Sequence, residues 1–228
     1  MSRLVTLVAG LALLAGPVVQ SRAGVRAYDM LSVDQRLRHV AVIGDSYTTG
    51  TDEGGLGANS WTALAWRTLA ARGLPVAGDV SAEGRAGYGV PGDHGSLFQD
   101  LTSRAVTPAD ALVVFFGSRN DQDVDPGQMA ERARDTFALA RRLAPSARFL
   151  VIGPPWPTAD VPPTVLGIRD VLRSAARAAK AVFIDPIGAR WFVDHPELIG
   201  ADGVHPNDAG HEYLADKIAP LIRARLSG

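Results

Sequence analysis

The sequence predicts an α/β domain in which helices cover both faces of a parallel sheet. From residue 39 onward, short apolar runs alternate with longer amphipathic stretches. This alternation is typical of parallel strands joined by right-handed crossover helices. Neither an internal repeat nor a low-complexity linker follows residue 37, so a single domain is expected over residues 38–228.

Five short apolar runs are the strand candidates. Residues 39–43 (HVAVI) end at Gly44, and residues 74–80 form a second, weaker candidate. Residues 111–116 (ALVVFF) are apolar throughout, which is the pattern of a strand buried on both faces. The last two candidates are residues 149–152 and 182–184.

Four amphipathic stretches are the helix candidates. The first begins at Asn59 or Ser60, either of which can cap a helix, and it ends at Gly73. The second begins at Asp125-Pro126, a capping residue followed by the residue favoured at the first helical position. The other two extend from about residue 164 to 180 and from near residue 207 towards the C-terminus.

The composition limits the chemistry of the protein. The net charge of −1 provides no basic surface for nucleic acid. The chain has no cysteine, which excludes disulfides, zinc–thiolate sites, a cysteine nucleophile and a lipid-modified cysteine anchor. Partial likenesses to phosphate and dinucleotide loops lack the required lysine or third glycine, so no cofactor is expected.

The N-terminal segment has the order of a secretory signal peptide. Arg3 supplies a positive start, residues 4–19 are almost wholly apolar, and Ala23 ends a small-residue site before Gly24. This order predicts a signal peptide over residues 1–23, and hence a secreted or cell-envelope protein. The alternative is an uncleaved membrane anchor, although glycines and a proline within the run weaken it as a spanning helix.

In a parallel sheet of this kind, ligands bind at the carboxyl ends of the strands, so functional residues are expected in the loops there. Ser46 follows the first strand in a glycine-bounded turn, GDSY. Such a turn holds a hydroxyl rigidly at the sheet edge, as a nucleophile requires, provided that a base is near. The alternative is ordinary turn chemistry.

The loop of residues 202–206 (DGVHP) contains a base and a group to orient it. Asp202 and His205 are three positions apart at a helix entrance, so that both can face the same side of one turn. One alternative is helix capping beside a solvated histidine. Another is a metal site made of Asp202, His205, Asp208 and His211, but that spacing matches no standard zinc pattern. We expect His211 itself to be exposed on the last helix.

Two further loops offer hydrogen-bond donors. Residues 117–121 (GSRND) follow the third strand, and Asn120 can present its amide N–H to an oxyanion. Residues 84–89 (GRAGYG) follow the second strand, and their glycines allow close backbone approach to a ligand. Taken singly, each loop is more often structural than functional.

Together, the four segments resemble the SGNH hydrolase family, also called the GDSL-type esterases and lipases. Residues 44–46 (GDS) match its first block, and the resemblance covers residue 40 to about residue 226. It implies a flavodoxin-like three-layer α/β/α sandwich with about five parallel strands. It also implies that Ser46 is the nucleophile, that Asp202 and His205 complete the triad, and that Asn120 and Gly87 stabilise the oxyanion. The sequence leaves open whether Gly84, Gly87 or Gly89 is the glycine donor.

The chain departs from the family pattern in two blocks. Tyr47 stands where the first block usually has leucine, and we expect it to reshape the mouth of the pocket. Ser118 occupies the glycine position of the third block, so the glycine role is expected to move to Gly117. Trp156, in a proline-rich loop, is the candidate wall of the pocket.

The resemblance implies a serine hydrolase that cleaves carboxylic esters of glycans, lipids or small molecules without a metal or cofactor, and the predicted signal peptide implies that it is exported. Two alternatives remain at this stage. An acyltransferase would use the same triad with another acceptor, and a catalytically silent carbohydrate-binding domain would have the same fold. The intact serine, asparagine, aspartate and histidine argue against the silent domain.

Overall fold

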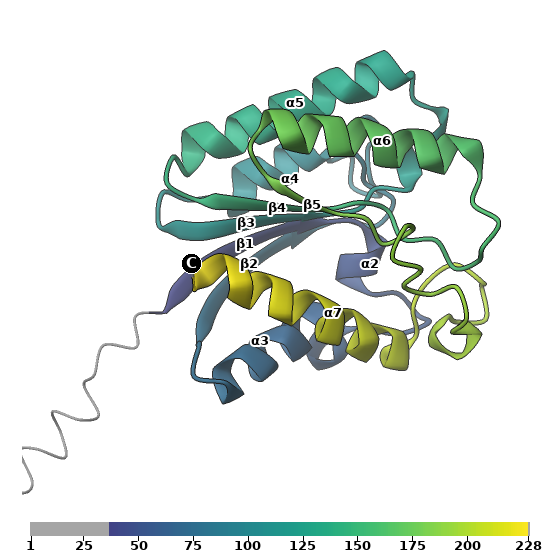
Figure 1. Ribbon diagram of the computed structural model, residues 1–228, viewed down its shortest axis with the longest axis horizontal. Coiled ribbons are helices and arrows are strands. Elements are labelled where there is room, and N and C mark those ends of the chain that lie inside the picture. The colour runs from purple at the N-terminus through teal and green to yellow at the C-terminus, as the bar shows by residue number, and fades with distance from the viewer. Residues whose placement is uncertain (1–36, 228) are drawn as a thin grey trace, which may run out of the picture. The chain divides into compact units, whose positions relative to one another are not determined.

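A computed structural model describes residues 37–227, which form a five-stranded, all-parallel sheet between two layers of helices (Figure 1). The strand order is β2-β1-β3-β4-β5, the order of flavodoxin-like folds. The strands are β1 (Arg38–Gly44), β2 (Val76–Ala82), β3 (Asp110–Phe116), β4 (Arg148–Ile152) and β5 (Val182–Ile184). The predicted fold class, with about five parallel strands, is therefore confirmed.

Each strand is followed in sequence by one or more helices, and these pack on the two faces of the sheet (Figure 1). In Figure 1, α4, α5 and α6 cover one face of the sheet, and α3 and α7 cover the other. The helices are α2 (Ser46–Thr49), α3 (Trp61–Ala71), α4 (Phe98–Ala105), α5 (Pro126–Leu143), α6 (Pro163–Ala178) and α7 (Asp208–Leu226). Short 3₁₀ turns are η1 (Gly57–Asn59), η2 (Asn120–Asp123) and η3 (Pro196–Leu198).

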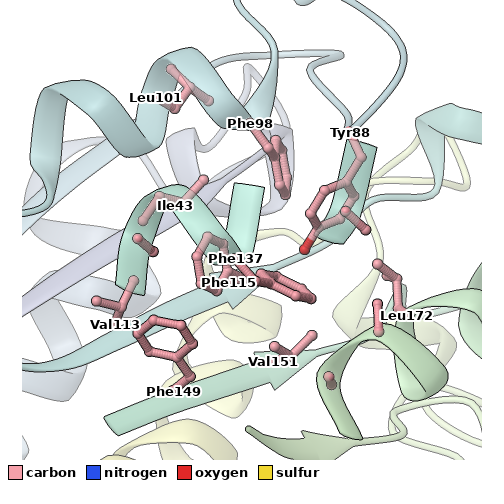
Figure 2. Close-up of a cluster of buried hydrophobic side chains, with 14 of the residues drawn as sticks. Ile43, Tyr88, Phe98, Leu101, Val113, Phe115, Phe137, Phe149, Val151 and Leu172 are labelled. Carbon is pink, nitrogen blue, oxygen red and sulfur yellow. The ribbon is translucent and has the colours of Figure 1, made fainter. Parts of the chain in front are cut away.

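Each layer has its own apolar core, because successive residues of a strand point to opposite faces. Phe115 of β3 packs against Phe137 and Phe149 on the α4–α6 side (Figure 2), with ring centroids 4.9 and 6.1 Å away. The next residue, Phe116, points to the other side and packs edge-on against Trp61 of α3 at 5.9 Å. The strong apolar run predicted for β3 therefore supplies both cores.

Two elements differ from the sequence prediction. The second strand begins at Val76 rather than residue 74, and its middle is exposed because β2 is an edge strand that pairs only with β1. The helix α4 was not predicted. It is short and polar on its outer face, and Asp100 supports its start by accepting the Leu97 N–H at 2.9 Å.

The topology fixes where a site can form. The chain passes from β1 outward to β2 and then returns to β3 on the other side of β1. This reversal creates a crevice at the carboxyl ends of β1 and β3, which is where ligands bind in open α/β sheets. Ser46 follows β1 and Asn120 follows the loop after β3, so both predicted residues belong to this edge.

The predicted signal peptide, residues 1–23, lies outside the described residues. Within residues 37–227, no helix has both the length and the apolar character needed to cross a membrane.

Candidate active site

Ser46 is the first residue of α2, directly beyond β1. Asp45 caps this short helix by accepting the Tyr47 N–H at 2.9 Å. The helix turns back over the end of the strand, since a Cβ on Gly44 would lie 2.2 Å from the Thr48 hydroxyl oxygen. Gly44 thus makes the sharp turn possible, and the turn presents the Ser46 hydroxyl at the sheet edge.

A continuous hydrogen-bonded chain joins Ser46 to the loop before α7. His205 Nε2 lies 3.0 Å from Ser46 Oγ, and His205 Nδ1 lies 2.5 Å from Asp202 Oδ2. With Nδ1–H donated to the carboxylate, Nε2 is left to accept the serine proton. The structure therefore brings together the three residues that the sequence predicted as nucleophile, base and orienting acid.

The Asp202 carboxylate is itself held by its own loop. Its Oδ1 accepts the backbone N–H groups of Val204 and His205, at 2.8 and 2.9 Å. Burial pushes the pKa of Asp202 upward, but these N–H groups and the His205 ring outweigh burial and hold it below the ordinary 3.8. Asp202 is therefore ionised at neutral pH and can stabilise a charged His205.

Gly87 is not free to donate, which corrects the sequence prediction. Its N–H is donated to the Val90 carbonyl at 2.8 Å. A Cβ at this position would lie only 2.4 to 2.7 Å from the buried Asp121 carboxylate, so Gly87 is needed for close packing. Gly89 is also engaged, because its N–H donates to Asp121 Oδ1 at 2.8 Å.

Gly84 is the glycine that borders the cleft at Ser46. The two residues line the same cavity, of about 380 Å³, and no acceptor within residues 37–227 takes the Gly84 N–H. The Ser46 N–H is likewise without an acceptor in that range. Two backbone donors are therefore available at the nucleophile. The cavity is lined by Ser46, Thr49, Gly50, Thr51, Ala82, Glu83, Gly84, Arg85, Asp93, His94 and His205.

Asn120 lies between the glycine loop and the nucleophile turn. Its Nδ2 donates to the Ala86 carbonyl at 2.9 Å and lies 3.5 Å from Asp45 Oδ2. The buried Ser118 hydroxyl accepts the Asn120 N–H at 3.2 Å. Gly117 has a φ of +130°, which favours glycine, and a Cβ there would lie 2.6 Å from Asp45 Oδ2. The position in this loop that requires a glycine is therefore residue 117 and not residue 118, as expected from the sequence.

Asp121 supports this edge in a way that sequence reasoning missed. Its buried carboxylate accepts the backbone N–H groups of residues 88, 89 and 90, at 2.8 to 3.0 Å. Burial raises its pKa, and these N–H groups oppose the rise. Asp121 therefore fixes the loop that follows β2 against the loop that follows β3.

Asp45 is a second buried carboxyl at the same edge, with 1% of its surface exposed. Burial raises its pKa from 3.8 to about 7, while the Tyr47 N–H and the Arg119 guanidinium oppose the rise. The charge of Asp121 adds to it. Asp45 therefore titrates near neutral pH.

Tyr47 does not lie at the pocket mouth, contrary to expectation. Its side chain is fully buried, 6.2 Å from the Phe116 ring and 6.4 Å from the Phe192 ring. Trp156 is not a wall of the cavity at Ser46. It lines a separate pocket of about 70 Å³, and the Arg119 guanidinium lies 4.3 Å from the centre of its ring.

His211 is buried rather than exposed, with 1% of its surface accessible. Its Nδ1 accepts the Trp61 N–H at 3.2 Å, and Gly55 packs directly against its ring. Burial lowers its pKa from 6.5 to about 4. Among residues 37–227, no group of three or more histidines, cysteines or carboxylates is arranged to hold a metal ion.

Fold and site together have the arrangement of a serine hydrolase: a Ser–His–Asp chain of hydrogen bonds at the carboxyl edge of a flavodoxin-like sheet. Residues 42–213 match the GDSL-like Lipase/Acylhydrolase family. A GDSL lipase of Mycobacterium tuberculosis is 69% identical over 231 residues, which cover 100% of both chains. The chain belongs to the GDSL-like lipase/acylhydrolase family, and it is a hydrolase of the SGNH type that acts on esters.

Solved structures show the same fold. The lipase/acylhydrolase from Enterococcus faecalis matches with a TM-score of 0.63 and 20% identity, covering 83% of this chain and 97% of that chain. A family two carbohydrate esterase from Clostridium thermocellum, in complex with cellohexaose, matches with a TM-score of 0.66 and 18% identity. That match covers 83% of this chain and 65% of the esterase chain.

Proposed function

We propose that this protein hydrolyses carboxylic esters with Ser46 as nucleophile, His205 as general base and Asp202 as the group that orients the base. The observation that carries the proposal is the unbroken chain from Asp202 through His205 to the Ser46 hydroxyl. The distances are 2.5 Å from His205 Nδ1 to Asp202 Oδ2 and 3.0 Å from His205 Nε2 to Ser46 Oγ, and both are within hydrogen-bonding range. The ring can therefore donate to Asp202 while it accepts the proton of Ser46.

The reaction proceeds in two halves. Ser46 Oγ attacks the acyl carbonyl while His205 Nε2 takes the serine proton, which gives a tetrahedral oxyanion. The oxyanion collapses, and the alcohol leaves with the proton from His205, so that Ser46 is acylated. Water then attacks the acyl group as His205 takes a proton from it. The carboxylic acid leaves, and His205 returns its proton to Ser46.

The oxyanion is stabilised by the free N–H groups of Ser46 and Gly84, which border the same cavity. Asn120 is the third donor in this proposal. One of its amide N–H groups donates to the Ala86 carbonyl at 2.9 Å, which orients the side chain beside the nucleophile turn. The other makes only a long contact of 3.5 Å with Asp45 Oδ2, which it exchanges for the oxyanion in this proposal. Loss of one such donor costs about 3 kcal/mol of transition-state stabilisation in enzymes of this kind.

The lining of the cavity favours esters in which the groups next to the reacting carbonyl, on the alcohol or the acyl side, are small or polar. Ala82 is the only apolar side chain among its lining residues, and the rest are polar, charged or glycine. Glycan, lipid and small-molecule esters all remain within this proposal, because the reacting carbonyl alone must enter the cavity. The named relatives include both a lipase and a carbohydrate esterase.

The test is hydrolysis of a series of nitrophenyl esters from acetate to long acyl chains. Ser46→Ala is expected to remove turnover of every ester while retaining the wild-type thermal unfolding curve. Ser103→Ala, at an exposed position of α4, is the matched control and should retain full activity. Full turnover by Ser46→Ala, or activity that a chelator abolishes and zinc restores, would contradict the proposed mechanism.

We also propose that the protein is exported and that the mature chain begins near Gly24. The apolar segment that ends at Ala23 supports this proposal. N-terminal sequencing of protein recovered from the culture medium and from the cell envelope decides between cleavage and anchoring. An intact N-terminus on membrane-bound protein would favour the anchor.

A further inference from the structure

We infer that the hydroxyl of Tyr47 is a positioning group, which holds the loop that carries Asp202 and His205 against the nucleophile helix. The inference rests on the proposed function. It concerns the residue at which this chain departs from the leucine usual in its family.

The geometry links adjacent residues of α2 to adjacent residues of the catalytic loop. Ser46 contacts His205, and the next residue, Tyr47, donates its hydroxyl to the carbonyl of Val204 at 2.5 Å. The rings of Tyr47 and His205 are 6.0 Å apart. One turn of helix therefore holds both the nucleophile and an anchor for the base.

The Tyr47–Val204 hydrogen bond matters because few other hydrogen bonds join the loop of residues 201–205 to distant segments. Gly203 has a φ of +68° and stands where an added Cβ would meet nothing within 4 Å, so this part of the loop is not enclosed. Within residues 37–227, the backbone of residues 201–205 has two hydrogen bonds to side chains of distant segments. These are the Tyr47 bond to Val204 and the bond from the Ala201 N–H to Glu53, at 2.7 Å.

Tyr47 is suited to this role because its ring cannot move freely. It packs edge-on against Phe116 and Phe192 and is fully buried. Burial also raises the pKa of Tyr47, although the nearby Arg119 guanidinium opposes the rise. The phenol therefore stays protonated and remains a donor to the Val204 carbonyl.

Removing the hydroxyl is expected to let the base drift relative to Ser46. A misplacement of about 1 Å at a catalytic group costs on the order of a hundredfold in rate. The loop also retains its bond to Glu53, so we expect Tyr47→Phe to lower kcat by about tenfold and to leave KM within about twofold of wild type.

The experiment compares Tyr47→Phe with Tyr88→Phe. Both changes delete one buried phenol oxygen. Tyr88 lies among the aromatic rings of the other core, 4.8 Å from Phe98 (Figure 2), and its hydroxyl has no hydrogen-bond partner within residues 37–227. Activity on a nitrophenyl ester is measured per active site titrated with a fluorophosphonate, so that the folded fraction does not affect the result.

The expected result is a lower kcat per titrated site for Tyr47→Phe and a wild-type value for Tyr88→Phe. A purely structural role for the hydroxyl would reduce the number of titrated sites without changing kcat per site, and that outcome would overturn the inference. Equal loss in both variants would also overturn it. Failure of the proposed function is distinguishable, because the wild-type protein would then neither cleave the ester nor react with the fluorophosphonate at Ser46.

Discussion

The buried carboxyl of Asp45 makes a quantitative prediction about stability. It is 1% exposed, and burial raises its pKa to about 7. A carboxyl whose pKa is higher in the folded than in the unfolded state stabilises the fold fully below its unfolded pKa. This contribution is lost as pH rises through the folded pKa. For Asp45 the loss extends from about pH 3.8 to about pH 7.

The size follows from the two pKa values. The interval from 3.8 to about 7, at 1.36 kcal/mol for each pH unit, corresponds to about 4 kcal/mol. Asp45→Asn has the shape of the protonated acid, retains an oxygen to accept the Tyr47 N–H, and does not titrate. The free energy of unfolding of wild type, minus that of Asp45→Asn, should therefore fall by up to about 4 kcal/mol between pH 4 and pH 7.

The assay is urea unfolding followed by tryptophan fluorescence at several pH values in this range. Asp216→Asn, at an exposed position of α7, is the matched control for the loss of a carboxylate at the surface. A constant difference between wild type and Asp45→Asn from pH 4 to pH 7 would refute the reasoning.

Three further predictions concern neighbouring groups. Burial lowers the pKa of His211 from 6.5 to about 4, so the wild-type protein should lose about 3 kcal/mol of unfolding free energy as pH falls through that interval. This pH dependence is opposite in sign to that of Asp45, and His211→Asn should remove it. Unfolding curves at pH 4 and pH 7 measure the effect. Asp202→Asn should lower kcat by about a thousandfold or more with little change in KM, since orientation of the base acts in the transition state; ester kinetics decide, and a change in KM alone would count against it. Gly87→Ala should destabilise the fold by about 1–3 kcal/mol through its clash with Asp121; thermal unfolding measures it, and an unchanged midpoint would contradict the packing role.

The opposite signs of Asp45 and His211 have a consequence for the wild-type protein. Between about pH 4 and pH 6.5, a rise in pH lowers the free energy of unfolding through Asp45 and raises it through His211. The two effects are of similar size and largely cancel. Each single variant is therefore expected to have a steeper pH dependence of stability than the wild-type protein in this range.

Much of the fold could be predicted because its signals are local. The apolar runs and the capping residues depend only on neighbours in sequence, and they located four of the five strands closely. The proximity of Ser46, Asp202 and His205 could be predicted for a related reason. Each follows a predicted element at the same edge of the sheet, and topology alone brings that edge together.

The remaining features depend on contacts between distant segments. Which glycine of this loop has a free N–H depends on two contacts that no local pattern reveals. The Val90 carbonyl takes the Gly87 N–H, and the Asp121 carboxylate takes the Gly89 N–H. The burial of Tyr47 likewise depends on where the loop containing Val204 arrives.

His211 did have a detectable signal. It lies three residues before Leu214 and seven before Ile218, on the helical stripe that α7 buries. Helical spacing was therefore a better guide to its burial than its polar character.

The most direct test of the central claim is to identify the residue that a fluorophosphonate labels. The protein is labelled, digested and mapped by mass spectrometry, with His205→Ala examined in parallel. We expect one phosphonylated residue per molecule, on the peptide that contains Ser46, and strongly reduced labelling of His205→Ala. Labelling of another serine, or equally fast labelling of Ser46 in His205→Ala, would contradict it.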